Sequence, residues 1–258
     1  MIQILKEHTP IQKPDLILLD FDGTISKLRT GWYDVMRDLM VDYIPGDKEQ
    51  VKKEAEAFID ESTGIPTIRQ MQWLAKQVAD CGEQAMEAWE YKKEFAARLR
   101  NTIEQRKQSI LSGEKPAEYY LVPGSVEFLN AIKEKGIPIY LASGTDDADV
   151  RAEAAALGVL DYFDVLMGAD PYADMCAKEE VLKKLIRPGL KMLVVGDGKV
   201  EIRLGAEAGA VTLGVASWDE YENFGPGLEP IKEKRLVNAG AHALVADFTD
   251  CNEILNWL

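Results

Sequence analysis

A short apolar run that ends in an acid constrains what this chain can fold into more than any other feature. Leu16 to Leu19 are four consecutive aliphatic residues after Pro14, and Asp20 follows them directly. A continuous apolar run of this length is typical of a strand that is buried on both faces, as in a parallel sheet. Such sheets bind ligands beyond the carboxyl ends of their strands. We therefore expect Asp20 to lie at the ligand-binding edge of a parallel sheet.

The second half of the chain alternates strand and helix patterns at short intervals. The expected strands are 137–142, 164–167, 191–195, 211–215 and 243–245, and the expected helices are 149–157, 179–186, 200–208 and 251–258. This alternation predicts an α/β fold, a Rossmann-like doubly wound parallel sheet with helices on both faces.

The stretch between the first two expected strands has a different pattern. It holds no strand-like run, and its apolar residues recur at helical spacing in four segments, 32–43, 48–61, 66–80 and 84–107. Glycine-containing breaks separate these segments. We expect an inserted all-helical domain at 27–118 and an α/β core domain made of 1–26 and 119–258. The alternative is a helical elaboration that packs rigidly on the sheet.

Composition and charge exclude several classes of protein. The chain has 258 residues, 47% of them hydrophobic, which is enough for a core domain with a smaller second domain. Its 30 Lys and Arg against 44 Asp and Glu give a net charge of -14, which opposes binding to nucleic acid and anionic membranes. A phosphate ester is repelled as well. Any phosphate site therefore needs local positive charge from a metal ion, a lysine or helix N-termini.

The cysteines and the N-terminal residues indicate a cytoplasmic protein. Cys81, Cys176 and Cys251 follow no C-x-x-C spacing, which argues against a zinc site or a disulfide framework and favours reduced thiols. The first residues lack the basic region and the apolar run of a signal peptide. No stretch reaches the apolar length of a membrane span, so we expect no membrane partner.

The first motif, Asp20-Phe21-Asp22-Gly23-Thr24, places two carboxylates two residues apart at the end of the first expected strand. Asp-Gly is a common turn dipeptide, so a solvated turn is one interpretation. The other is catalytic. One carboxylate can attack phosphorus and form an aspartyl-phosphate, while the other protonates the leaving oxygen and later activates water.

Three later motifs also lie at expected strand ends or helix starts. Ser143-Gly144-Thr145 could hold phosphate oxygens or cap the next helix. Lys178 begins a helix, where its ammonium could neutralise a phosphoryl group or simply face solvent. Gly196-Asp197 with Glu201 offers carboxylates beside a glycine turn, which suits Mg²⁺, although an ordinary turn is again the alternative.

In this order, the four motifs resemble those of the haloacid dehalogenase superfamily, and the helical insert resembles its C1-type cap. The likeness covers the α/β part of the chain. It implies that Asp20 is the nucleophile and that Asp22 is the general acid and base. Dehalogenases and phosphonate-cleaving members do not use the second acid of the first motif, so Asp22 favours phosphoryl transfer.

The resemblance also implies a Mg²⁺ cofactor. Its expected ligands are Asp20, the backbone carbonyl of Asp22, and Asp197. Glu201 stands where the family often has Asp, and it could act through water or by pairing with Lys178. We therefore count Glu201 among the metal-site residues without assigning it direct contact.

Further residues are expected to bind the phosphate or to recognise the leaving group. Ser143 and Lys178 would hold the phosphoryl group, and cap residues would contact the rest of the substrate. The full set is Gly23, Thr24, Ser143, Gly144, Lys178, Arg29, Trp32 and Arg69. Core or hinge packing is the alternative for Trp32, and pairing with an acid is the alternative for Arg69.

Three functions remain open from the sequence. The favoured one is a Mg²⁺-dependent phosphatase, a monomer or homodimer that hydrolyses a small phosphate ester such as a sugar phosphate or a phosphoglycolate-like acid. A phosphomutase of the β-phosphoglucomutase type shares the core chemistry but returns the phosphoryl group to its substrate. A binding or regulatory module without activity is the third hypothesis, which the presence of all expected acids opposes.

Overall fold

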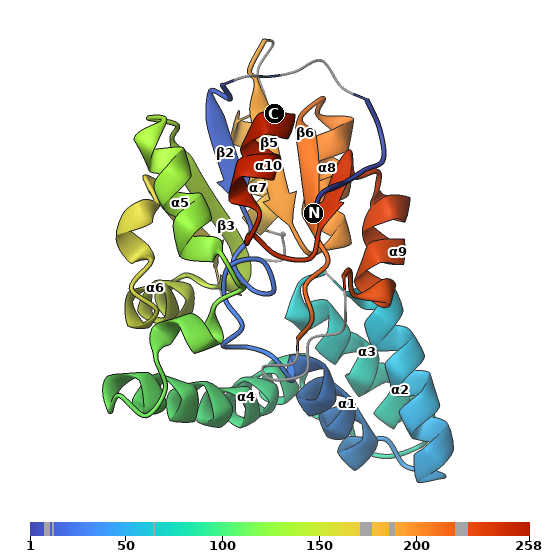
Figure 1. Ribbon diagram of the computed structural model, residues 1–258. Coiled ribbons are helices and arrows are strands. Elements are labelled where there is room, and N and C mark those ends of the chain that lie inside the picture. Colours follow the sequence, from blue (N-terminus) through green and yellow to red (C-terminus); the bar gives the residue numbers. More distant parts are fainter. Residues whose placement is uncertain (8–10, 12, 64, 171–176, 186–188, 220–226) are drawn as a thin grey trace. The chain divides into compact units, whose positions relative to one another are not determined.

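The protein is described by a computed structural model of residues 1–258, apart from residues 8–10, 12, 64, 171–176, 186–188 and 220–226 (Figure 1). It divides into two compact units. The core unit is Met1–Leu28 with Lys107–Leu258, and the helical unit is Arg29–Arg106. The predicted domain limits of 27 and 118 differ from these bounds, and the existence of two independent domains stays a prediction.

The core unit contains a seven-stranded sheet in the order β1-β7-β6-β5-β2-β3-β4. Its strands are β1 (Gln3–Ile4), β2 (Leu16–Leu19), β3 (Ile139–Asp146), β4 (Val165–Ala169), β5 (Met192–Gly196), β6 (Val211–Val215) and β7 (Ala243–Val245). The neighbouring strands run parallel, except that β1 pairs antiparallel with β7. The predicted α/β fold with a parallel sheet is confirmed.

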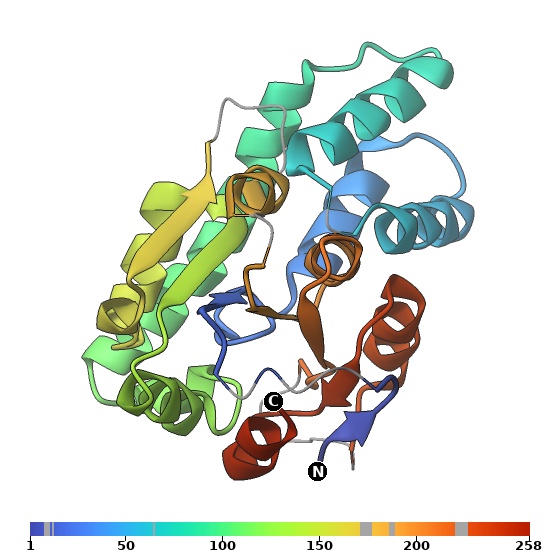
Figure 2. The same ribbon diagram turned by 90° about the horizontal axis from the view of Figure 1, so that it is seen from above.

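Helices cover both faces of this sheet (Figure 2). They are α5 (Ser125–Glu134), α6 (Asp147–Ala156), α7 (Ala177–Leu185), α8 (Lys199–Glu207), α9 (Pro230–Ala239) and α10 (Cys251–Trp257). Successive side chains of a strand point to opposite faces. Ile17 and Leu19 therefore pack in the cluster with α5, α6 and α10, whereas Leu16 and Leu18 pack with Val181 and other residues of α7. Burial on both faces explains the uninterrupted apolar run of β2.

The helical unit is built from amphipathic helices, as predicted. They are α1 (Trp32–Tyr43), α2 (Lys48–Ser62), α3 (Thr67–Asp80) and α4 (Ala88–Leu111), which continues past the end of the unit. Asp47 caps α2 by accepting a hydrogen bond from the N–H of Gln50. The apolar faces of the four helices share one buried cluster, which includes Met36, Ile59, Leu74 and Phe95.

Several elements differ from the sequence predictions. β1, α5 and α9 were not predicted. β3 was expected to end at Ala142, but it continues to Asp146, because Asp146 still pairs with Ala169 of β4 after a shift of register. Ser143 therefore lies within an irregular strand end and not after the strand.

Two further expectations concerned reduced cysteines and the absence of a membrane span. Cys81 and Cys251 are free thiols, and Cys176 lies outside the described residues. Among the helices that the structure describes, none is long and apolar enough to cross a membrane.

Candidate active site

The parallel strands bring the core motifs to one edge of the sheet. Leu19, the last residue of β2, pairs with Leu141 of β3 on one side and with Val195 of β5 on the other. Asp20 and Asp197 follow the ends of their strands, and Ser143 lies two residues beyond the paired position of β3. The first, second and fourth motifs therefore meet at the carboxyl edge, where parallel sheets bind their ligands.

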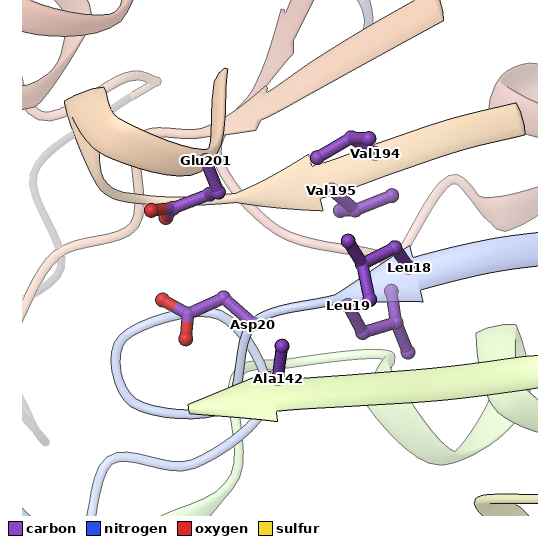
Figure 3. A pocket seen from close by; sticks show the side chains of 7 residues that line it. All are labelled: Leu18, Leu19, Asp20, Ala142, Val194, Val195 and Glu201. Atoms are coloured by element: carbon purple, nitrogen blue, oxygen red, sulfur yellow. The ribbon is translucent and has the colours of Figure 1, made fainter. Parts of the chain in front are cut away.

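Three carboxylates form an acidic cluster at this edge. Asp20, Asp197 and Glu201 each offer an oxygen, and these oxygens all lie within 4.8 Å of one another. Asp20 and Glu201 are only 5% and 3% exposed. Figure 3 shows both carboxylates on the same side of the strand ends, beside a pocket with apolar walls from β2 and β5. Buried like charges at this separation repel, and an all-oxygen set suits a hard divalent cation such as Mg²⁺.

Glu201 reaches the cluster because it lies in the first turn of α8. Its Oε1 accepts a hydrogen bond of 2.7 Å from the N–H of Gly198, the residue before the helix. A Cβ at Gly196 or Gly198 would lie 2.4 Å or 2.7 Å from that same oxygen. The two glycines of the fourth motif thus leave room for the Glu201 carboxylate, which ties this acid to the turn that carries Asp197.

The turn of the first motif packs closely against Asp197. Gly23 has a φ of 76°, and a Cβ there would lie 2.0 Å from Oδ2 of Asp197. Thr24 is fully buried, and its Oγ1 accepts a hydrogen bond of 3.0 Å from the N–H of Asp197. The first and fourth motifs therefore fix each other, and a phosphate contact for Gly23 and Thr24 stays a prediction.

The second motif holds Asp22. Oδ2 of Asp22 accepts hydrogen bonds from Oγ1 of Thr145 at 2.7 Å and from Oγ of Ser143 at 3.3 Å. Ser143 is buried, and its Oγ also accepts from the N–H of Thr145 at 3.0 Å. These contacts fix the orientation of the expected general acid. Thr145 belongs to the second motif but was not counted among the site residues, although its position two residues after Ser143 could have indicated a shared face of the strand.

A second group of polar side chains follows β6, and sequence reasoning assigned no role to its members Ser217 and Lys232. Oγ of Ser217 donates a hydrogen bond of 2.8 Å to the carbonyl of Gly23. Lys232 of α9 donates to Oδ1 of Asp219 at 2.8 Å and lies 3.2 Å from Oδ2 of Asp197. Burial works against the ammonium of Lys232, but the two carboxylates raise its pKa above the usual range.

The sequence at the start of α9 could have indicated the position of Lys232. Glu229 accepts hydrogen bonds from the N–H groups of Ile231 and Lys232, and Pro230 occupies the first turn. Proline at the first position of a helix is a recognised helix start. It could have placed a helix, and with it Lys232, after the strand at 211–215.

Lys27 is a second buried lysine close to this group. It is 2% exposed, and burial lowers its pKa to about 8, with a further lowering by Lys232 and an opposing effect from Asp219. A lysine whose folded-state pKa lies below its unfolded value of 10.5 destabilises the fold while it is protonated.

Lys27→Met is therefore expected to raise the free energy of unfolding at neutral pH by about 1–3 kcal/mol. The wild-type lysine is charged in both states below pH 8, so its burial has the full cost there. Between pH 8 and 10.5 the folded state releases the proton first, and the advantage of the methionine variant should shrink. Urea denaturation of both proteins across this range measures the difference. A variant that is less stable than wild type at every pH would contradict the assignment.

The structure does not test the roles of the remaining predicted site residues. Lys178 lies in the first turn of α7, and its side chain is outside the described part of the structure. Gly144 is exposed. In the helical unit, Arg69 donates to Oε1 of Gln72 at 3.2 Å, and Trp32 stacks edge-on against its neighbour Tyr33. The roles of these residues, and that of Arg29, stay predictions.

The family of the chain follows from comparison with known proteins. The model of the haloacid dehalogenase-like hydrolases matches residues 14–209. The chain belongs to this family of hydrolases, as its motifs indicated. Comparison with curated proteins gives no significant match.

Solved structures of low sequence identity share the fold. A predicted phosphoglycolate phosphatase from Haemophilus somnus 129pt is 17% identical, with 95% of this chain and 99% of that chain covered and a TM-score of 0.59. A predicted phosphatase from Clostridium acetobutylicum is 14% identical, with 95% and 100% covered and a TM-score of 0.60. A β-phosphoglucomutase from Clostridium difficile is 19% identical, with 94% and 97% covered and a TM-score of 0.58.

Proposed function

We propose that this hydrolase is a Mg²⁺-dependent phosphatase that cleaves a small phosphorylated metabolite through an aspartyl-phosphate on Asp20. The acidic cluster of Asp20, Asp197 and Glu201, with oxygens within 4.8 Å of one another, carries the proposal. Asp22 supports it, because two hydroxyl groups hold the carboxyl group of this second acid. The family assignment is consistent with a hydrolytic reaction.

The metal ion would be held by Asp20, Asp197 and the backbone carbonyl of Asp22, with Glu201 beside them. When bound, Mg²⁺ supplies positive charge that offsets the repulsion between the nucleophile and the phosphate oxygens. The donor set fits this cation, because all of its members are oxygens and the glycine at position 23 leaves space for the Asp197 carboxylate.

The reaction divides into two displacements at phosphorus. A carboxylate oxygen of Asp20 forms the new bond to phosphorus as the ester bond breaks, and Asp22 gives its proton to the leaving oxygen. Asp22 then takes a proton from water, whose oxygen attacks phosphorus and releases inorganic phosphate and Asp20. The hydrogen bonds from Thr145 and Ser143 keep Asp22 in one orientation for both steps.

Binding of the transferring group is assigned to the predicted residues. Ser143 and Gly144 at the end of β3, together with Lys178 in the first turn of α7, would hold the phosphate oxygens. Arg29, Trp32 and Arg69 of the helical unit would contact the rest of the substrate. A sugar phosphate or a phosphoglycolate-like acid is the expected class.

A phosphomutase is the second candidate, favoured by the likeness to the β-phosphoglucomutase structure. It uses the same acids, but the aspartyl-phosphate is passed to a substrate hydroxyl instead of water. A binding module without activity is the third, and the presence of every expected core acid opposes it. A cytoplasmic location and a monomeric or homodimeric state stay predictions.

A phosphate-release screen over a panel of phosphorylated metabolites, with Mg²⁺ and with excess chelator, tests the proposal. The expected result is metal-dependent release of inorganic phosphate from one or more small esters. An isomeric phosphate ester as the main product would replace the phosphatase with the mutase. No turnover on the panel together with no Mg²⁺ binding would contradict the enzymatic function.

A further inference from the structure

Lys232 connects the candidate metal site to a part of the fold that lies outside the four motifs. Its side chain is 10% exposed, and its ammonium lies 3.2 Å from Oδ2 of Asp197. The same ammonium donates to Asp219 at 2.8 Å and to Oγ of Ser217 at 3.4 Å. A fixed cation therefore contacts an acid that is assigned to the metal ion.

The surroundings of Asp197 leave it few other orientations. Oδ2 lies 2.0 Å from the position that a Cβ of Gly23 would take, and Thr24 accepts a hydrogen bond from the Asp197 backbone N–H. Ser217, which also contacts Lys232, donates to the carbonyl of Gly23. The segment after β6 and the start of α9 thus hold the Gly23 turn and the Asp197 carboxylate together.

We propose that Lys232 is a positioning residue that holds Asp197 by Oδ2 and shares the charge of this carboxylate with the metal ion. The inference rests on the proposed function, because it assigns Asp197 to the metal. Two cations on one carboxylate repel each other, so the ammonium weakens metal binding. The same contact fixes Asp197 in the orientation that turnover needs.

This double role predicts two opposite effects of Lys232→Met. Loss of the ammonium leaves the acidic cluster more negative, so metal affinity should rise by about threefold or more. Loss of the contact removes the restraint on Oδ2 of Asp197, so kcat should fall by about tenfold or more while KM for the ester changes little. A residue that only supported the fold would weaken both properties.

The experiment measures Mn²⁺ binding to the full-length protein without substrate, by electron paramagnetic resonance, with Mg²⁺ as competitor. Lys232→Arg keeps the charge and should keep the wild-type affinity with partial turnover. Lys234→Met removes an exposed lysine from the same helix and should match wild type in both measurements. Thermal unfolding establishes that each variant is folded, and Lys232→Gln replaces the methionine variant if that variant is not.

Unchanged or weaker Mn²⁺ affinity in the folded, uncharged variant would overturn the role of Lys232, and so would wild-type turnover. These outcomes leave the proposed function intact. Absence of Mn²⁺ binding to the wild-type protein would instead contradict the metal site itself, and the inference would fail with it.

Discussion

Asp20→Asn is expected to lower Mg²⁺-dependent phosphate release by a factor of at least about 10³. The amide has nearly the shape of the carboxylate, so it should fit the buried position of Asp20, which is 5% exposed. It lacks the nucleophilic oxygen anion, however, and it removes one negative charge from the acidic cluster. Catalysis should therefore be lost without loss of the fold.

Steady-state phosphate release and thermal unfolding of the variant check this expectation. Asp161→Asn, at an exposed position of the core unit, is the matched control and should retain wild-type activity. If Asp20→Asn keeps full activity on the best substrate of the panel, Asp20 is not the nucleophile. The acidic cluster of Asp20, Asp197 and Glu201 would then need another role.

Gly23→Ala is the second change with a large expected effect. The methyl carbon would lie 2.0 Å from Oδ2 of Asp197, and the backbone has a φ of 76°, which L-residues rarely adopt. Asp197 must move, and Asp22 lies next to the altered turn. We expect activity to fall by about 10² or more, with weaker Mg²⁺ binding.

Gly158→Ala separates steric contact from backbone strain. Gly158 has a similar φ of 71°, but nothing lies within 4 Å of an added Cβ. This control should lose about 1 kcal/mol of stability and no activity. Similar kinetic losses in both variants would show that contact with Asp197 is not the cause, and unchanged kinetics in Gly23→Ala would contradict the geometry of the site.

The position of Asp20 could be predicted because its cause is local. The run from Leu16 to Leu19 matches β2, and burial of this strand on both faces requires such a run. The end of β3 could not be predicted, because Asp146 is held by irregular pairing with Ala169 of a later strand. Strand ends that depend on partners far along the chain leave no local pattern.

The residues that support the acidic cluster were harder to predict than the acids themselves. Lys232 reaches Asp197 from α9, and Ser217 reaches Gly23 from the segment just after β6. The residues next to Lys232 and Ser217 in the sequence do not indicate these contacts. Lys27 likewise looks like an ordinary surface lysine in the sequence, and only the fold shows that it is buried.

In the helical unit, the helices could be predicted from the sequence, but the residues that would contact a substrate could not. Its four helices were expected from the spacing of apolar residues, which the shared cluster of Met36, Ile59, Leu74 and Phe95 explains. Periodicity describes the buried face alone. Exposed polar residues such as Arg69 show no comparable pattern, so the sequence pattern does not predict the substrate.

Chemical trapping of the phosphorylated protein tests the central claim most directly. The wild-type protein is mixed with its best substrate and Mg²⁺, quenched in acid, and treated with borohydride, which reduces an aspartyl-phosphate to homoserine. Peptide mass spectrometry should then find homoserine at position 20, and none in the chelator control. Rapid phosphate release with an unmodified Asp20, or with the modification at another acid, would contradict the account.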